Sequence, residues 1–247
     1  MGLVDSLTIG AIVFAPLMLA LWFTYRKYAY PYTTYTYFNG QKIMMAIAGG
    51  MVVGLILSLS YRFLPPYYLG YAVFFAFLEE LIRLVVLNSP FFQLKFDSIF
   101  YGAALGGGTA TMIISGIAYT TQYASASGSD LWSPAILASL VLFSVSLNLL
   151  NIANGAMIGY GCGKGIVWTY TLYAIIAHAM FNIALIGMIY PDPSAVGIFY
   201  YPSVAGTILI SVIMYVYVYR NMVENALPEK LRKQRRRELL AMARRGK

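Results

Sequence analysis

The chain has 247 residues, of which 60% are hydrophobic and 11% are charged, and its mean hydropathy is +0.69. This composition excludes a soluble globular domain and is typical of a helical protein that crosses a membrane several times. Most of the net charge of +8 lies in the C-terminal tail and not over a nucleic-acid-binding face, so we expect membrane lipid and no nucleic acid as a partner. A single cysteine, Cys162, excludes a disulfide framework and a cysteine-based metal site.

Seven hydrophobic segments follow one another, each long enough to cross about 30 Å of hydrocarbon as a helix. They run from about Leu7 to Tyr25, Ile43 to Leu64, Tyr67 to Pro90, Phe96 to Tyr123, Trp132 to Tyr160, Ile166 to Tyr190 and Ile198 to Tyr219. The first lacks a basic leader and a small-residue cleavage site, so we interpret it as a retained helix. The predicted fold is all-α, with a seven-helix transmembrane domain over residues 1–227 and a basic tail over residues 228–247.

Basic residues predict the orientation of these seven segments. On the side of the tail, the connecting segments carry Arg26, Lys27, Lys42, Lys95 and Lys164. On the opposite side they carry Asp5, Arg62, Asp130 and Asp192. Because loops rich in lysine and arginine stay in the cytoplasm, we expect a multi-pass protein of the cell membrane with its N-terminus outside and its tail in the cytoplasm.

The tail from Glu229 onward is expected to form an amphipathic helix, with Leu231, Leu239, Leu240 and Met242 as its apolar positions. Such a helix would anchor the topology and contact anionic lipid.

Three consecutive glycines, Gly106, Gly107 and Gly108, lie inside the fourth segment. Glycines in a membrane helix let neighbouring backbones approach at short range, so we expect tight helix packing here. A phosphate-binding loop is the alternative, but it requires a strand before the glycines and a lysine and serine after them, and the sequence has neither.

Three ionisable residues, Glu79, Glu80 and Arg83, lie near the middle of the third segment. Charge at that depth is costly unless it is paired or hydrated, so it is usually functional. Arg83 follows the glutamates by three and four positions and can reach back to one of them, which leaves the other carboxylate in need of a partner. The alternative is a structural ion pair that locks the helices together.

Other polar residues lie at a similar depth in the fifth and sixth segments. His178 and Asn182 are one helical turn apart and share a face. Asn148, Asn151 and Asn154 recur every three residues along one broad side of the fifth segment. In hydrocarbon such groups gain by facing each other or a wet cavity, where a glutamate can activate water and an imidazole or amide can stabilise an oxyanion. Interhelical hydrogen bonds without catalysis are the alternative.

Three motifs resemble those of the PrsW-type intramembrane proteases, which share a superfamily with the type II CAAX prenyl proteases. They are Glu79-Glu80-Leu-Ile-Arg83, the segment from Asp97 to Gly106, and His178-Ala-Met-Phe-Asn182. The resemblance covers roughly the third to sixth segments. It implies that Glu80, or Glu79, activates water, with His178 and Asn182 as partners. If a divalent metal such as zinc is bound, the resemblance implies His178 and Glu80 as ligands.

Asn151 departs from that pattern, because it stands where the family has a second histidine. An amide is a poor zinc ligand, and a catalytic zinc site normally has three good protein ligands. Chemistry would then proceed without metal, with Asn151 as a hydrogen-bond donor, or catalysis has been lost. The anterior-pharynx-defective subunit of gamma-secretase is a seven-helix relative that serves as a scaffold.

Three functions therefore remain open. The chain can be an intramembrane endopeptidase that acts on a transmembrane or lipid-modified protein. It can be an inactive relative that binds a partner helix. It can also be a transporter with a proton-linked glutamate, although the sequence has no internal repeat of the kind that many transporters carry.

Overall fold

The computed structural model describes residues 3–63, 69–125, 134–189 and 196–245, and every regular element within these ranges is helical. The elements are α1 (Leu3–Tyr25), η1 (Arg26–Tyr28), α2 (Gly40–Phe63), α3 (Leu69–Leu87), α4 (Ser98–Ser125), α5 (Pro134–Lys164), α6 (Val167–Ile189), α7 (Val196–Asn221), α8 (Val223–Ala226) and α9 (Glu229–Arg245). The predicted all-α fold is confirmed, and each expected hydrophobic segment contains one long helix.

Six of the described helical segments are long and apolar enough to cross a membrane, which indicates a multi-pass membrane protein. These segments begin in α1, α2, α4, α5, α6 and α7. Of the seven expected spans, the one outside this set is α3, which places three charged residues within 19 residues. Length and composition thus support six of the seven predicted spans, and α3 is the exception.

The centre of the bundle is α4. The apolar stretch of α4 that could cross the membrane is 83% buried, compared with 17% to 56% for the corresponding stretches of the other five candidate spans. Its three consecutive glycines make this burial possible, and each faces a different helix. A Cβ atom at Gly106 would collide with the carbonyl oxygen of Asn151 on α5, and one at Gly108 with that of Ile47 on α2. At Gly107 the side chain of Leu17 on α1 fills the space. The predicted close packing at these glycines is confirmed.

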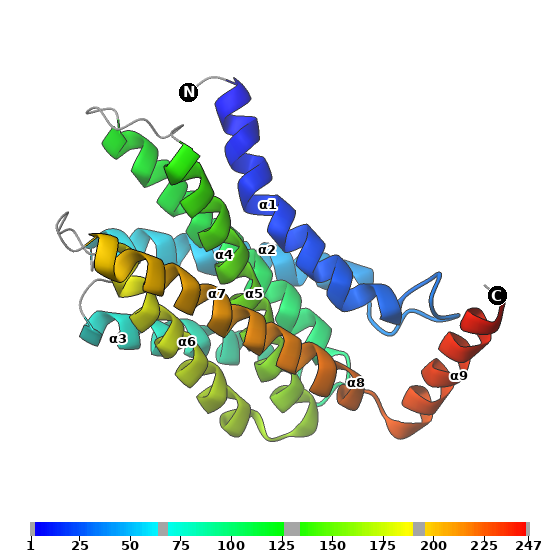
Figure 1. Ribbon diagram of the computed structural model, residues 1–247. Helices are drawn as coiled ribbons and strands as arrows, with labels where there is room; N and C mark the ends of the chain where they lie inside the picture. The colour runs from blue at the N-terminus through cyan, green and yellow to red at the C-terminus, as the bar shows by residue number, and fades with distance from the viewer. Residues whose placement is uncertain (1–2, 64–68, 126–133, 190–195, 246–247) are drawn as a thin grey trace.

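The C-terminal helix α9 lies outside the bundle, at the end where α1 leads into α2 (Figure 1). One face of α9 makes its contacts with the rest of the chain. The guanidinium of Arg235 lies 4.5 Å from the ring centroid of Tyr28 and pairs with Glu224 at 3.0 Å, and Leu231 packs against the hydrophobic core. Arg236 also pairs with Glu224, at 2.8 Å. Of the predicted apolar positions, Leu231 packs against the core, whereas Leu240 is 61% exposed.

Candidate functional site

The three charged residues of α3 are all buried inside the bundle. Glu79, Glu80 and Arg83 are each at most 1% exposed. Buried charges are tolerated only when partners replace the water they have lost. Each of the three must therefore be explained by its neighbours, which come from α3 itself, α5 and α6.

Arg83 pairs with both glutamates. Its Nη1 donates to Oε1 of Glu80 at 2.6 Å, and its Nη2 contacts Oε1 of Glu79 and Oδ1 of Asn151. The spacings of three and four residues place all three side chains on one face of α3, as the sequence predicts. The expectation that Arg83 neutralises only one carboxylate was wrong, because the two nitrogens of the planar guanidinium fork reach separate acceptors.

His178 on α6 lies against both glutamates. Its Nδ1 is 2.6 Å from Oε1 of Glu80, and its Nε2 is 3.6 Å from Oε2 of Glu79. An ionised carboxylate only accepts hydrogen bonds, so Nδ1 donates to it. The cluster therefore holds two carboxylates, one guanidinium and an imidazole that can carry a second positive charge.

Asn154 on α5 completes the surroundings of Glu80. Its Nδ2 donates to Oε1 of Glu80 at 2.9 Å and to the carbonyl of Ala174 at 3.2 Å. Oε1 of Glu80 thus accepts from Arg83, His178 and Asn154, whereas its Oε2 is buried without a hydrogen-bond partner among the described residues. The two oxygens of this carboxylate are in different states, and the unpartnered one is available to a further donor.

Asn151 and Asn182, the two amides predicted to be catalytic, have structural partners. Asn151 accepts from Arg83 through Oδ1 and donates through Nδ2 to the carbonyl of Leu147 at 2.9 Å. Asn182 donates to the carbonyl of Ala72 at 3.0 Å. Ala72 precedes Glu80 by eight residues, which is about 12 Å along a helix. Asn151 therefore orients Arg83, and Asn182 holds α6 to α3 away from the carboxylates.

Sequence reasoning listed Asn154 but did not select it as a site residue. The three asparagines recur at the same spacing, and the resemblance drew attention to Asn151 because it stands where the family has a histidine. Asn148 donates to the carbonyl of Ser144 at 3.0 Å, within its own helix. Asn154 follows Asn151 by three residues, nearly one helical turn. This spacing could have indicated that both lie on the side of α5 that meets α3.

The donors around Glu80 do not fit a zinc ion. Within the described ranges, no group of three histidine, cysteine, aspartate or glutamate side chains is arranged to hold a metal. The guanidinium of Arg83 contacts both carboxylates, so a fixed positive charge already takes the place of a cation. Nδ1 of His178 is engaged with Glu80, which leaves too few ligands for a catalytic zinc site.

Comparisons of the chain with protein-family models, curated proteins and solved structures gave no significant match. The fold and the cluster define the class of protein: a helical, multi-pass membrane protein with a buried polar cluster around Glu80. The resemblance to the PrsW-type proteases rests on residues of this chain alone.

Proposed function

We propose that this chain is an intramembrane endopeptidase in which Glu80 activates a water molecule. The observation that supports this function is the unpartnered Oε2 of Glu80. Buried polar atoms seldom lack a partner, so such an oxygen marks a place for a donor such as water. A carboxylate held on one side by three donors, with free lone pairs on the other, has the form expected of a general base.

In the proposed reaction, Oε2 of Glu80 takes a proton from water while the water oxygen attacks the carbonyl carbon of a peptide bond. The carbonyl oxygen becomes an oxyanion, and the protonated Glu80 returns its proton to the amine when the C–N bond breaks. An imidazolium at His178 would balance the charge of the cluster and leave an N–H at Nε2 to stabilise the oxyanion. Arg83 and Asn154 act as positioning residues, because they hold Oε1 of Glu80.

We further propose that α3 is the seventh membrane span, and that the protein lies in the cell membrane with its N-terminus outside and its tail in the cytoplasm. Two ion pairs within α3, from Arg83 to Glu79 and Glu80, support this span. Together with the hydrogen bond from Asn154 to Glu80, they reduce the cost of burying these charges in a membrane. The loop distribution of lysine and arginine supports the orientation. The substrate would be a transmembrane segment or a lipid-modified terminus of a membrane protein.

The test is Glu80→Gln, which preserves the size of the side chain, assayed with a panel of co-expressed, tagged membrane proteins. Loss of a general base lowers the rate by about 10²–10⁴-fold, so cleavage should fall below detection. The matched control is Glu229→Gln on α9, where the carboxylate is 67% exposed. Cleavage that persists in a folded Glu80→Gln protein would refute the role of Glu80.

A second function is a membrane scaffold that binds a partner without catalysis. The burial of the polar cluster favours this function. Glu79, Glu80 and His178 are all at most 1% exposed, so the described structure offers a substrate no path to them. A scaffold should copurify with a stable partner, and Glu80→Gln should leave proteolysis of that partner unchanged. The endopeptidase should instead accumulate uncleaved substrate when Glu80 is replaced.

A further inference from the structure

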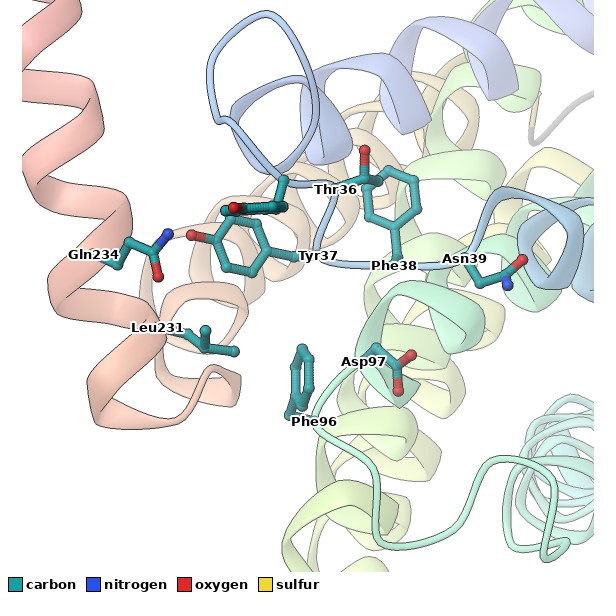
Figure 2. Close-up of a pocket in the computed structure, with 9 residues that line it drawn as sticks. Thr36, Tyr37, Phe38, Asn39, Phe96, Asp97, Leu231 and Gln234 are labelled. Atoms are coloured by element: carbon teal, nitrogen blue, oxygen red, sulfur yellow. The ribbon is translucent and has the colours of Figure 1, made fainter.

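A pocket of about 420 Å³ lies between α9 and the bundle, separate from the Glu80 cluster. Its walls come from three places in the chain: residues 35–39 of the segment before α2, Phe96 and Asp97 just before α4, and Leu231 and Gln234 of α9. Figure 2 shows these side chains around one hollow, with α9 on one side and the start of α4 on the other.

The pocket lies at the level where the membrane-length helices end. Residues 35–39 fall between the spans that end at Tyr28 and begin at Gly40, and Asp97 directly precedes the span that begins at Ser98. Tyrosine and phenylalanine side chains are common at this level of a bilayer. A ligand of this pocket can therefore come from a lipid headgroup or from the adjacent water.

Tyr37 supplies a buried hydroxyl that has no hydrogen-bond partner among the described residues. The side chain is 6% exposed, and its hydroxyl points toward α9 (Figure 2). Burial raises the pKa of this phenol, so it stays neutral and can both accept and donate a hydrogen bond. An unpartnered buried hydroxyl in the wall of a pocket indicates a polar ligand.

Asp97 gives the pocket its charge. Among the described residues that line it, Asp97 alone is charged. Oδ2 of Asp97 accepts from the hydroxyl of Tyr101 at 2.7 Å, and that hydroxyl accepts from the backbone N–H of Asn39 at 3.0 Å. These bonds fix the carboxylate while leaving it further acceptor positions.

Four aromatic residues line the same pocket as this carboxylate: Tyr35, Tyr37, Phe38 and Phe96. Ring faces attract cations, and rings combined with a carboxylate recognise ammonium groups. A primary ammonium has N–H donors for Asp97, whereas a quaternary ammonium has none. The hydroxyl of Tyr37, on the α9 side of the hollow, offers the ligand a second polar contact. The lining is thus suited to a primary amine.

We propose that this pocket binds a primary ammonium group, carried by an ethanolamine phospholipid headgroup or by a soluble phosphoethanolamine. The surroundings suit the phosphate of such a ligand. Lys42 follows the lining segment by three residues, and its Nζ lies 5.7 Å from the ring centroid of Tyr101, whose hydroxyl bonds to Asp97. The carboxylate of Asp97 and the ammonium of Lys42 match the two charges of the zwitterion.

The test measures lipid binding to the purified full-length protein in detergent by native mass spectrometry. The ligands are phosphatidylethanolamine, phosphatidylcholine and phosphatidylglycerol with identical acyl chains, and soluble phosphoethanolamine. The ethanolamine lipid should bind about tenfold more tightly than the other two lipids. Asp97→Asn should remove this preference, and Tyr37→Phe should weaken it about threefold.

Two matched controls are Glu229→Gln, at a carboxylate that is 67% exposed, and Tyr30→Phe, at a ring that is 83% exposed. Both should keep the preference. Binding of soluble phosphoethanolamine as tightly as the lipid would support the ammonium site and identify a soluble source. Equal binding of the three lipids, or tighter binding of phosphatidylglycerol, would overturn the proposal. If Asp97→Asn does not fold, Tyr37→Phe decides, because it removes only a hydroxyl that has no partner.

Discussion

Nδ1 of His178 on α6 lies 2.6 Å from Oε1 of Glu80 on α3, so one hydrogen bond joins two helices across 98 residues of sequence. Interhelical hydrogen bonds in membranes are worth about 0.6 kcal/mol on average. This bond belongs to a larger set, because Glu80 also accepts from Arg83 and Asn154. The carboxylate of Glu80 is therefore the point at which α3, α5 and α6 are held together.

Replacement of Arg83 should destabilise the protein more than the loss of any exposed ion pair. Arg83→Met leaves two buried carboxylates without their counter-charge, and breaking a buried pair costs about 3–5 kcal/mol. We expect a large drop in the free energy of unfolding, measured in detergent micelles. The control is Lys233→Met, which removes an ion pair whose two side chains are 67% exposed and should cost less than about 1 kcal/mol. Similar losses in the two variants would contradict the structure.

Gly106→Ala should separate α4 from α5. The added Cβ meets the carbonyl oxygen of Asn151, which belongs to the backbone and cannot turn aside. Overpacking of this kind costs about 1–3 kcal/mol, and the shift of α5 should also move Asn151 away from Arg83. The control is Gly10→Ala on α1, where a Cβ would have no neighbour within 4 Å, so a change of the opposite sign, about 0.5 kcal/mol of stabilisation, is expected. Thermal unfolding in micelles measures both, and equal effects would argue against close α4–α5 packing.

The asparagines of α5 should differ in their contribution to stability. Asn154→Leu removes two hydrogen bonds, one of them to the carboxylate of Glu80, and should cost about 2–4 kcal/mol. Asn148→Leu removes only a bond within its own helix, so it should be close to neutral. The Oδ1 atoms of both asparagines lack a partner among the described residues, so their removal does not distinguish the two variants. The same unfolding assay compares the two variants. A greater loss at Asn148 would contradict the described hydrogen bonds.

Arg235 should control whether α9 stays docked. It is 5% exposed, lies over Tyr28 and pairs with Glu224, so Arg235→Gln should let α9 leave the bundle more often. Amide hydrogen exchange in α9 should then accelerate at least tenfold, as expected for the loss of about 1.4 kcal/mol of docking free energy. Arg237→Gln, at an exposed position of the same helix, should leave exchange unchanged. Equal exchange in both variants would exclude Arg235 as the anchor.

The sequence predicted the helices well because hydropathy and charge are properties of single segments. Each expected span contains one long helix, and the glycines at 106–108 pack as expected. Three consecutive glycines leave every side of the helix open there, so close packing can be predicted from the sequence without knowing which neighbour each glycine meets.

Partner choice inside the cluster was harder to predict. Arg83 was expected to pair with one glutamate and pairs with two. Asn151 was the predicted site residue of α5, whereas Asn154 is the one that donates to Glu80. Residues three apart on a helix differ by about 60° in direction, so the tilt of α5 against α3 decides which amide reaches the carboxylate. That tilt depends on packing across the bundle and has no local signal. The docking of α9 through Arg235 has the same origin, because its partners lie on η1 and α8.

The burial of Glu80, at 0% exposure, bears on the rate of the proposed reaction. In the proposed endopeptidase, a peptide chain could reach this carboxylate after a separation of α3 and α6, which would break the bond from His178 to Glu80 and the bond from Asn182 to Ala72. Turnover would then follow the frequency with which the two helices separate, and the intrinsic speed of bond cleavage would matter less. In its resting form the proposed enzyme is closed by these two hydrogen bonds, and any factor that weakens them would raise the rate of turnover.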